Sequence, residues 1–336
     1  MPAPPGAAQP GAVQPMARLG SANAHPTIGL DVGGTKLLGG IVAADGQLLH
    51  RERWATPKQG GQDLLMAIVT IVRELWATAG QELPVGIGIA GSVDGDGVVR
   101  FAPNIADLEG MALRAQLQEH LYGHADGALL LDNDANVAAW GEYRFGAGRG
   151  HGDSLVMLTI GTGVGGGLIQ HGALVRGRHG MAGEVGHLLL QPDGPRCGCG
   201  NDGCLEALAS GTAIGRLAQE RLDTTTAPSL LRDAGPVTGK AVTIAAQSDD
   251  AFARDVLDTA GFWLGVGIAS LVNALDPGVV IVGGGAMEAS ELLLGPARRA
   301  AQERLIGRPV RQLPPIVEAE LGDDAGMVGA ADLVRG

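Results

Sequence analysis

The chain has 336 residues, of which 45% are hydrophobic, 18% charged and 3% aromatic. This composition excludes an intrinsically disordered chain, and the length favours two lobes over one continuous core. The formal net charge is -12 and no run of Lys or Arg occurs, so we expect no nucleic-acid-binding face.

The first half begins with an irregular stretch. Residues 1–24 are rich in Pro, Ala, Gly and Gln, lack the basic start and apolar run of a signal peptide, and predict a disordered tail. Residues 27–32 then predict a buried strand. Further predictions are strands over 37–43, 47–55, 85–90 and 128–131, and helices over 64–77, over 113–121 and through 140–143.

The second half of the chain begins like the first, with a strand, a Gly-rich turn and a second strand. Its predicted elements are strands over 154–160, 168–171 and 173–175, a helix from 205, a long helix over about 250–274, a strand over 278–282 and a closing helix after 322–326. No apolar run is judged long enough to span a membrane. The repeat predicts two α/β lobes that face each other across a cleft.

The first Gly-rich turn follows residues 27–32. Gly33 and Gly34 allow a phosphate to approach the backbone closely, while Thr35 and Lys36 add donors. Asp31, at the strand end, could hold a metal ion through water. An ordinary hairpin turn is an equal alternative for this segment, and the spacing of a Walker loop is absent.

The second Gly-rich turn, over 161–167, matches Gly-x-Gly-x-x-Gly at Gly161, Gly163 and Gly166. A dinucleotide site would need a helix after the glycines, but the following residues are too few and too strand-like, so we reject it. The two Gly-rich hairpins, one from each lobe, can instead bind a triphosphate from both sides. Gly284 and Gly285, after a later strand, fit either an adenosine contact or a tight strand–helix turn.

Polar side chains gather where the strand over 128–131 meets the next helix. The segment Asp132-Asn133-Asp134-Ala135-Asn136 has more polar groups than a helix N-cap requires. A general base for a sugar hydroxyl would be well placed there, with an N-cap as the simpler alternative.

All three cysteines fall in one short stretch. Cys197, Cys199 and Cys204, with His187 nearby, form a Cys3His set suited to structural tetrahedral zinc, which we favour over three small buried residues. An odd, clustered set also fits a reducing compartment. Glu206 follows the loop closely, so zinc would orient it.

Together these motifs resemble the ROK (repressor, open reading frame, kinase) family of sugar kinases. The resemblance runs from Ile28 to the end of the chain and includes the motifs over 31–36, 133–136, 161–167, 184–187, 197–206 and 322–326. It implies a two-lobed α/β fold of the actin/hexokinase-like (ribonuclease H-like) ATPase type, with ATP and Mg2+ as cofactors besides Zn2+. Members of the family are commonly dimers or tetramers, so a homodimer or homotetramer is expected. The cysteine pattern and the apolar runs described above add the expectation of a cytoplasmic protein that contacts no membrane.

The resemblance assigns roles to particular residues. Asp134 takes the position of the catalytic base, and Asn133 lies beside it. The expected substrate-binding residues are Gly91, Asn104, Asn133, Asp134, Glu184, His187 and Glu206, and the zinc ligands are His187, Cys197, Cys199 and Cys204. The expected nucleotide-binding residues are Asp31, Gly33, Gly34, Thr35, Lys36, Thr162, Gly163, Gly284 and Gly285.

The lobe boundaries and the substrate complete the expectation. We place a small lobe over 25–132, completed by the C-terminal helix at about 318–336, and a large lobe with the zinc loop over 133–317. Residues 204–214 look most like the bacterial glucokinases, so transfer of the γ-phosphoryl of ATP to the C6 hydroxyl of glucose is expected.

Three other functions stay as alternatives. Residues 90–94 lack the Pro-Gly pair of many glucokinases, so a kinase for an N-acetylhexosamine or fructose is one alternative. A sugar-sensing repressor is disfavoured, because the residues before Ile28 are too few for a helix-turn-helix module. A non-catalytic sugar-binding protein is disfavoured by the intact Asp31 and Asp134.

Overall fold

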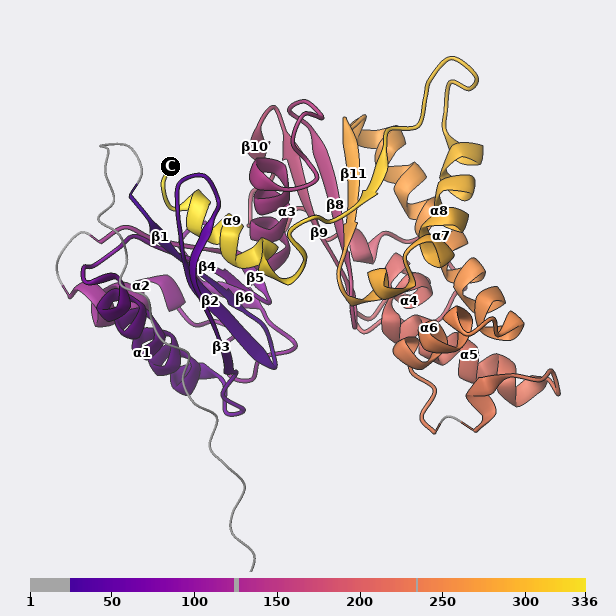
Figure 1. Cartoon of the computed structure of the whole chain (residues 1–336), viewed down its shortest axis with the longest axis horizontal. Helices are drawn as coiled ribbons and strands as arrows, with labels where there is room; N and C mark the ends of the chain where they lie inside the picture. Colours follow the sequence, from indigo (N-terminus) through magenta and orange to yellow (C-terminus); the bar gives the residue numbers. More distant parts are fainter. Residues whose placement is uncertain (1–24, 124–126, 234) are drawn as a thin grey trace, which may run out of the picture.

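The structure is a computed structural model that describes residues 25–123, 127–233 and 235–336. The predicted tail over 1–24 lies outside the described residues. Figure 1 shows two α/β halves side by side, and the C-terminal helix returns to the N-terminal half.

A five-stranded sheet in the order β3-β2-β1-β4-β7 forms the N-terminal half. Its strands are β1 (Thr27–Val32), β2 (Lys36–Val42), β3 (Leu48–Ala55), β4 (Val85–Ile89) and β7 (Leu129–Asn133), and a separate hairpin joins β5 (Ser92–Val93) to β6 (Val99–Phe101). The parallel strands β1, β4 and β7 align Val32, Ile89 and Asn133. The residues that follow these three strands therefore leave the sheet at one edge.

A second five-stranded sheet, in the order β10-β9-β8-β11-β12, forms the C-terminal half. Its strands are β8 (Leu155–Ile160), β9 (Val164–Gln170), β10 (Ala173–Leu174), β11 (Val279–Gly283) and β12 (Ile316–Glu318). Strand β8 is antiparallel to β9 and parallel to β11. Each sheet thus starts with an antiparallel hairpin and continues in parallel, which agrees with the repeat inferred from the sequence.

Helices form three layers around the two sheets. The α-helices are α1 (Gly61–Ala79), α2 (Leu113–Tyr122), α3 (Asp134–Phe145), α4 (Leu205–Ala209), α5 (Gly211–Thr224), α6 (Gly239–Gln247), α7 (Ala251–Leu275), α8 (Glu291–Arg304) and α9 (Ala325–Leu333). Four 3-10 turns are η1 (Val185–His187), η2 (Leu230–Arg232), η3 (Gly285–Ala289) and η4 (Gly322–Asp324). Helices α1 and α2 pack on the first sheet, α3 and α9 lie between the sheets, and α4–α8 pack beyond the second.

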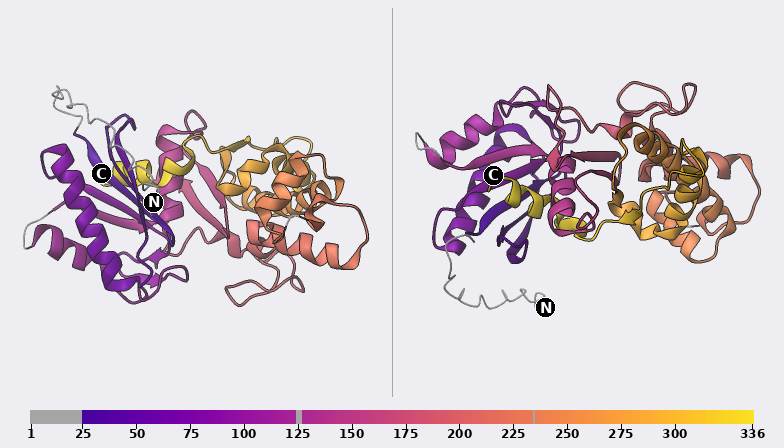
Figure 2. Two further views of the ribbon diagram at one scale, coloured as in Figure 1. Left: turned by 60° about the horizontal axis from the view of Figure 1, so that its bottom comes forward. Right: turned by 90° about the horizontal axis from the view of Figure 1, so that it is seen from above.

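The alternation of side chains along β8 explains this layering. Val156, Leu158 and Ile160 are buried in the core shared with α5, α7 and α8, whereas Leu155 and Met157 are buried against α3. Because successive side chains of a strand point to opposite faces, a strand covered on both faces is apolar throughout. Figure 2 shows the same order of layers from two other directions.

Helix α9 packs unusually close to the first sheet because glycines lie beneath it. A Cβ on Gly86 would lie 1.8 Å from the Ala330 carbonyl oxygen, and one on Gly29 would lie 1.9 Å from that of Met327. Thr27 Oγ1 also donates to the Ala331 carbonyl at 2.6 Å. The last helix of the chain therefore packs directly on the backbone of the N-terminal sheet.

Two sequence predictions were wrong in extent. The Gly-rich turn predicted over 161–167 is shorter, because β9 already begins at Val164 and pairs with β8. Gly167 is a strand residue beneath α3, where an added Cβ would lie 2.4 Å from the Ala139 Cβ. The helix predicted from Leu205 is also two helices, since Ser210 ends α4 and caps α5 through Ala213 N.

Helix α7 contradicts the expectation that no apolar segment reaches the length of a membrane span. By length and composition alone, Ala251–Leu275 is long and apolar enough to cross a membrane. Within the fold, however, 61% of the most apolar 18-residue segment of this helix is buried. Val256, Leu264 and Ile268 lie in the core with α8. Such burial is typical of the central helix of a globular core.

Candidate active site

Two adjoining cavities lie at the edges where the strands of the two sheets end. The smaller, of about 310 Å3, contains every substrate-binding residue predicted from the sequence: Gly91, Asn104, Asn133, Asp134, Glu184, His187 and Glu206. The larger measures about 710 Å3. Gly161 lines both cavities, so a group bound in one can reach a molecule bound in the other at this point.

The turn between β7 and α3 holds Asp134 by hydrogen bonds at the start of the helix. Asp134 Oδ1 accepts from its neighbour Ala135 N at 2.8 Å and from Asn133 Nδ2 at 3.0 Å. Asn133 Oδ1 caps α3 by accepting from Asn136 N at 3.0 Å. The N-cap is thus Asn133, which leaves the role of base predicted for Asp134 as a separate assignment that stays a prediction.

Two carboxylates near the cavity are poorly solvated. Burial, assisted by the charge of Glu184, raises the pKa of Asp134 to about 6, although the hydrogen bond from Ala135 N opposes the shift. Burial, with the charge of Asp134 as the next cause, raises the pKa of Asp31 to about 7. Burial and charge repulsion of this kind favour a proton acceptor active near neutral pH and a nearby divalent cation.

Glu184 and the loop before it are tied to the first sheet. Ser92 Oγ, buried on β5, donates to Glu184 Oε1 at 3.0 Å. Arg176 Nε donates to Asp132 Oδ2 at 2.7 Å, and Asp132 Oδ1 accepts from Asn133 N at 2.8 Å. The loop that carries Glu184 is therefore coupled to the turn that carries Asp134.

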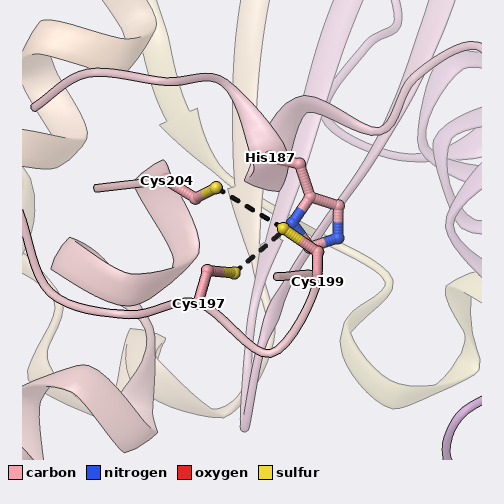
Figure 3. Close-up of side chains that lie close together, drawn as sticks. All are labelled: His187, Cys197, Cys199 and Cys204. Atoms are coloured by element: carbon pink, nitrogen blue, oxygen red, sulfur yellow. Dashed lines mark hydrogen bonds between the residues drawn. The ribbon is translucent and has the colours of Figure 1, made fainter. Parts of the chain in front are cut away.

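The predicted zinc ligands come together in one cluster (Figure 3). One ligand atom from each of His187, Cys197, Cys199 and Cys204 lies within 4.8 Å of all the others. The Cys199–Cys204 Sγ separation is 3.7 Å, and Cys197 Sγ lies 3.6 Å from His187 Nδ1. Tetrahedral zinc with bonds of about 2.0–2.3 Å requires ligand separations of roughly 3.5–3.8 Å, so these residues fit that ion.

The histidine of this cluster reaches the smaller cavity. His187 Nδ1 faces Cys197, and His187 also lines the smaller cavity. Since Nδ1 points to the sulfur cluster, Nε2 is the nitrogen left for a hydroxyl group. The two ring nitrogens are distinct, so both roles predicted for His187 are compatible with its position.

Glu206 joins the sulfur cluster to the second Gly-rich turn. Its Oε2 accepts from Val164 N at 2.9 Å, and its Oε1 lies 3.5 Å from Cys197 Sγ. A few residues further on, Gly211 N donates to the Gly161 carbonyl at 2.8 Å and Thr212 Oγ1 to that of Thr162 at 2.7 Å. The segment that follows the Cys/His cluster, at the starts of α4 and α5, thus holds the turn over 161–163.

The larger cavity contains residues that the sequence analysis did not select. Besides the predicted Thr162 and Gly285, it is lined by Gly211, Thr212, Thr238, Gly239, Lys240 and Glu288. Helices α5 and α6 both begin here, capped by Ser210 and Thr238. Two helix N-termini offer free N–H groups and positive dipole ends to phosphate. The paired Ser-Gly and Thr-Gly starts were a signal that could have identified them.

The first Gly-rich turn lines neither cavity. An added Cβ on Gly34 would lie 2.7 Å from the Asn104 carbonyl oxygen, so this turn packs beside a residue of the smaller cavity. Lys36 Nζ lies 2.7 Å from Asp323 Oδ2 in the turn before α9. The predicted nucleotide residues are therefore divided: Thr162, Gly163, Gly284 and Gly285 line the two cavities, whereas Asp31 and the turn over 33–36 line neither.

Comparisons with known proteins agree with this geometry. The ROK family model matches residues 27–336. A glucokinase of Streptomyces coelicolor is 39% identical over 317 residues, which are 92% of this chain and 97% of that protein. An N-acetylmannosamine kinase of Yersinia pseudotuberculosis is 34% identical over 306 residues, which are 90% of this chain and 96% of that protein.

A solved structure is similar over almost its whole length. The crystal structure of a ROK family glucokinase from Streptomyces griseus, in complex with glucose and AMPPNP, has a TM-score of 0.79 and 42% identity, and covers 93% of this chain and 99% of that chain. The chain belongs to the ROK family and has its two-lobed actin/hexokinase-like fold, as the sequence motifs implied.

Proposed function

We propose that this chain is an ATP-dependent glucokinase, which transfers the γ-phosphoryl group of ATP to the C6 hydroxyl of glucose. The observation that carries the proposal is the pair of cavities joined at Gly161, with Asp134 in the smaller one. The glucokinase relatives support glucose as the acceptor and ATP as the donor.

In the proposed mechanism the sugar lies in the smaller cavity. Asn104, Glu184, His187 and Glu206 would bind its hydroxyls, and the C6 hydroxyl would face Asp134. The Asp134 carboxylate accepts the proton of that hydroxyl as the oxygen attacks the γ-phosphorus, and the bond from the γ-phosphorus to the bridging oxygen breaks, so that ADP leaves with that oxygen. The positioning of the two reactants supplies much of the rate enhancement.

ATP would lie in the larger cavity. The N-termini of α5 and α6 and the turn over 161–163 surround the phosphates, with Lys240 nearby. Asp31 is the carboxylate that would hold Mg2+, and the ion would supply positive charge to neutralise the phosphates. Zn2+, when bound by His187 and the three cysteines, fixes the loop that carries Glu206.

A panel of sugars tests the proposal directly. ADP release should be measured with glucose, fructose, mannose, N-acetylglucosamine and N-acetylmannosamine, and we expect the highest kcat/KM for glucose. A preference for an N-acetylated sugar would contradict glucose as the substrate and would favour the activity of the N-acetylmannosamine kinase relative. The homo-oligomer and the cytoplasmic location stay predictions, which light scattering and cell fractionation would test.

The Asp134→Asn variant tests the role of the base. We expect it to bind glucose with unchanged affinity and to lose about 10²–10⁴-fold in kcat, because the amide cannot accept the proton. Calorimetric titration with glucose and steady-state assays measure the two quantities. A kcat close to that of the unchanged enzyme would remove Asp134 from this role.

A further inference from the structure

A third cavity lies outside the candidate active site. Its volume is about 410 Å3, and it is enclosed by the β5 turn, the start of α2, strand β7 and the segment 176–180. Gly180 lines both this cavity and the smaller cavity of the candidate active site. An added Cβ on Gly180 would lie 1.9 Å from the Val93 carbonyl oxygen, so the segment is pressed against β5. A single stretch of backbone therefore separates the two cavities.

Three arginines line this third cavity: Arg114, Arg176 and Arg178. Arg114 uses one nitrogen, which donates to the Gly95 carbonyl at 3.1 Å, and Arg176 uses Nε for Asp132. Within the part of the chain that the structure describes, Arg178 has no hydrogen-bond or ion-pair partner. Most of the guanidinium donors at this cavity are thus free, in a chain whose formal net charge is -12.

The two carboxylates of the same cavity are already engaged. Asp94 accepts from Asp96 N and Val98 N, each at 3.0 Å, and forms an ion pair with Arg100 at 2.6 Å. Asp132 is buried and accepts from Asn133 N, Asn136 Nδ2 and Arg176 Nε. The cavity therefore offers spare donors and few spare acceptors, which selects for a ligand that carries an oxyanion.

We propose that this cavity is a second binding site, separate from the active site, for a small phosphomonoester. The guanidinium groups would hold the phosphate, and Leu130 of β7 would contact the carbon skeleton, because the side chains of Leu129 and Leu131 lie in the core of the N-terminal half. The cavity is larger than a phosphate ion needs, which favours an ester over inorganic phosphate. A hexose 6-phosphate belongs to this class, and choosing it as the first probe rests on the proposed function.

Occupancy of this site would act on the active site through Arg176. A phosphate that draws Arg176 away leaves the buried Asp132 Oδ2 without its partner. Asp132 also holds Asn133 N and Asn136 Nδ2, on either side of Asp134. The ligand should therefore lower kcat without competing with the sugar.

Binding can be tested on the full chain with its active site filled. Glucose 6-phosphate and inorganic phosphate are titrated calorimetrically in the presence of saturating glucose and a non-hydrolysable ATP analogue. We expect one site per chain, tighter binding of the ester than of phosphate, and at least tenfold weaker ester binding in Arg178→Ala. The matched control is Arg299→Ala, an exposed arginine of α8 that pairs with Asp258, and its binding should be unchanged.

Turnover gives a second, independent measurement. At saturating glucose and ATP, glucose 6-phosphate should lower the kcat of the unchanged enzyme and of Arg299→Ala, whereas Arg178→Ala should keep its basal kcat and resist inhibition. Absence of binding to the filled enzyme, or equal binding by Arg178→Ala, would overturn the proposal. Because binding is measured without turnover, a chain that phosphorylates no sugar could still confirm this site, and an active glucokinase could still refute it.

Discussion

Protonation of a single carboxyl group should set the acid limit of activity. The pKa of Asp134 is raised to about 6 by burial and by the charge of Glu184, and a general base works only when deprotonated. We therefore expect kcat/KM for glucose to be level above about pH 7 and to fall roughly tenfold per pH unit below about pH 5. A rate profile from pH 4.5 to 8 checks this, and full activity at pH 5 would contradict it.

The same shift makes Asp134 costly for the fold. Folding raises its pKa above the ordinary 3.8, so between about pH 4 and 6 the native state binds more protons than the unfolded state. The free energy of unfolding contributed by this group therefore falls as the pH rises through that window. Asp134→Asn should melt at the same or a higher temperature at pH 7, which would show that its loss of turnover is not unfolding.

At the scale of elements, the loop that carries Cys197, Cys199 and Cys204 leads into contacts with the turn between the two cavities. Glu206 contacts Val164 N, and the start of α5 contacts the carbonyl of Gly161. The sequence motifs alone place the predicted ATP contacts outside the cysteine loop, so by themselves they predict that zinc loss acts mainly on sugar binding and changes nucleotide affinity little. With the contacts known, we predict that Cys199→Ser loses its zinc and weakens binding of both glucose and the ATP analogue, by about tenfold or more for glucose.

Elemental analysis and calorimetry measure these effects. Arg196→Ala is the matched control in the same loop, because its exposed pair with Asp202 at 3.3 Å should contribute little. It should keep one zinc per chain and both affinities. Full zinc content in Cys199→Ser, or zinc-free protein with unchanged affinities, would refute the role assigned to the metal.

The contact between α9 and the first sheet predicts a steric effect. In Gly86→Ala the new Cβ would lie 1.8 Å from the Ala330 carbonyl oxygen, so α9 must move, at a cost of about 1–3 kcal/mol. Gly95→Ala is the control: nothing lies within 4 Å of a Cβ added there and its φ is not positive, so its stability should change by less than about 0.5 kcal/mol. Urea unfolding measures both, and equal stability of the two variants would contradict the packing argument.

At the scale of the whole molecule, the positions of the two Gly-rich turns imply movement of the lobes. Lys36 pairs with Asp323 and lines neither cavity, whereas the turn over 161–163 lies between the cavities. For both turns to contact one triphosphate, the lobes must approach each other. We predict that glucose and a non-hydrolysable ATP analogue together reduce the radius of gyration measured by X-ray scattering. Unchanged scattering at full occupancy would contradict closure.

Local pattern by itself was enough to define most elements of this protein. The strand over 27–32 was predicted with its observed bounds, and α7 begins and ends within a residue or so of its prediction. Strand alternation, helical periodicity and Gly or Asp boundaries are properties of neighbouring residues, so the sequence displays them. The motif order also identified the family, and the Cys3His spacing predicted a cluster that the fold forms.

Other features depended on contacts between segments far apart in the chain. Gly165 to Gly167 look like a loop in the sequence but belong to β9, because neighbours on both faces of the strand leave no room for side chains. An added Cβ would lie 2.4 Å from Ala139 Cβ of α3 at Gly167, and 2.3 Å from Val185 Cγ2 at Gly166. The starts of α5 and α6 form one cavity wall only after folding, and Lys36 turns to Asp323, 287 residues away. The arginine-lined cavity likewise joins α2, β7 and the segment 176–180, which no local pattern connects. Packing and charge pairing across the fold decided these features, because both depend on distance in space and not along the chain.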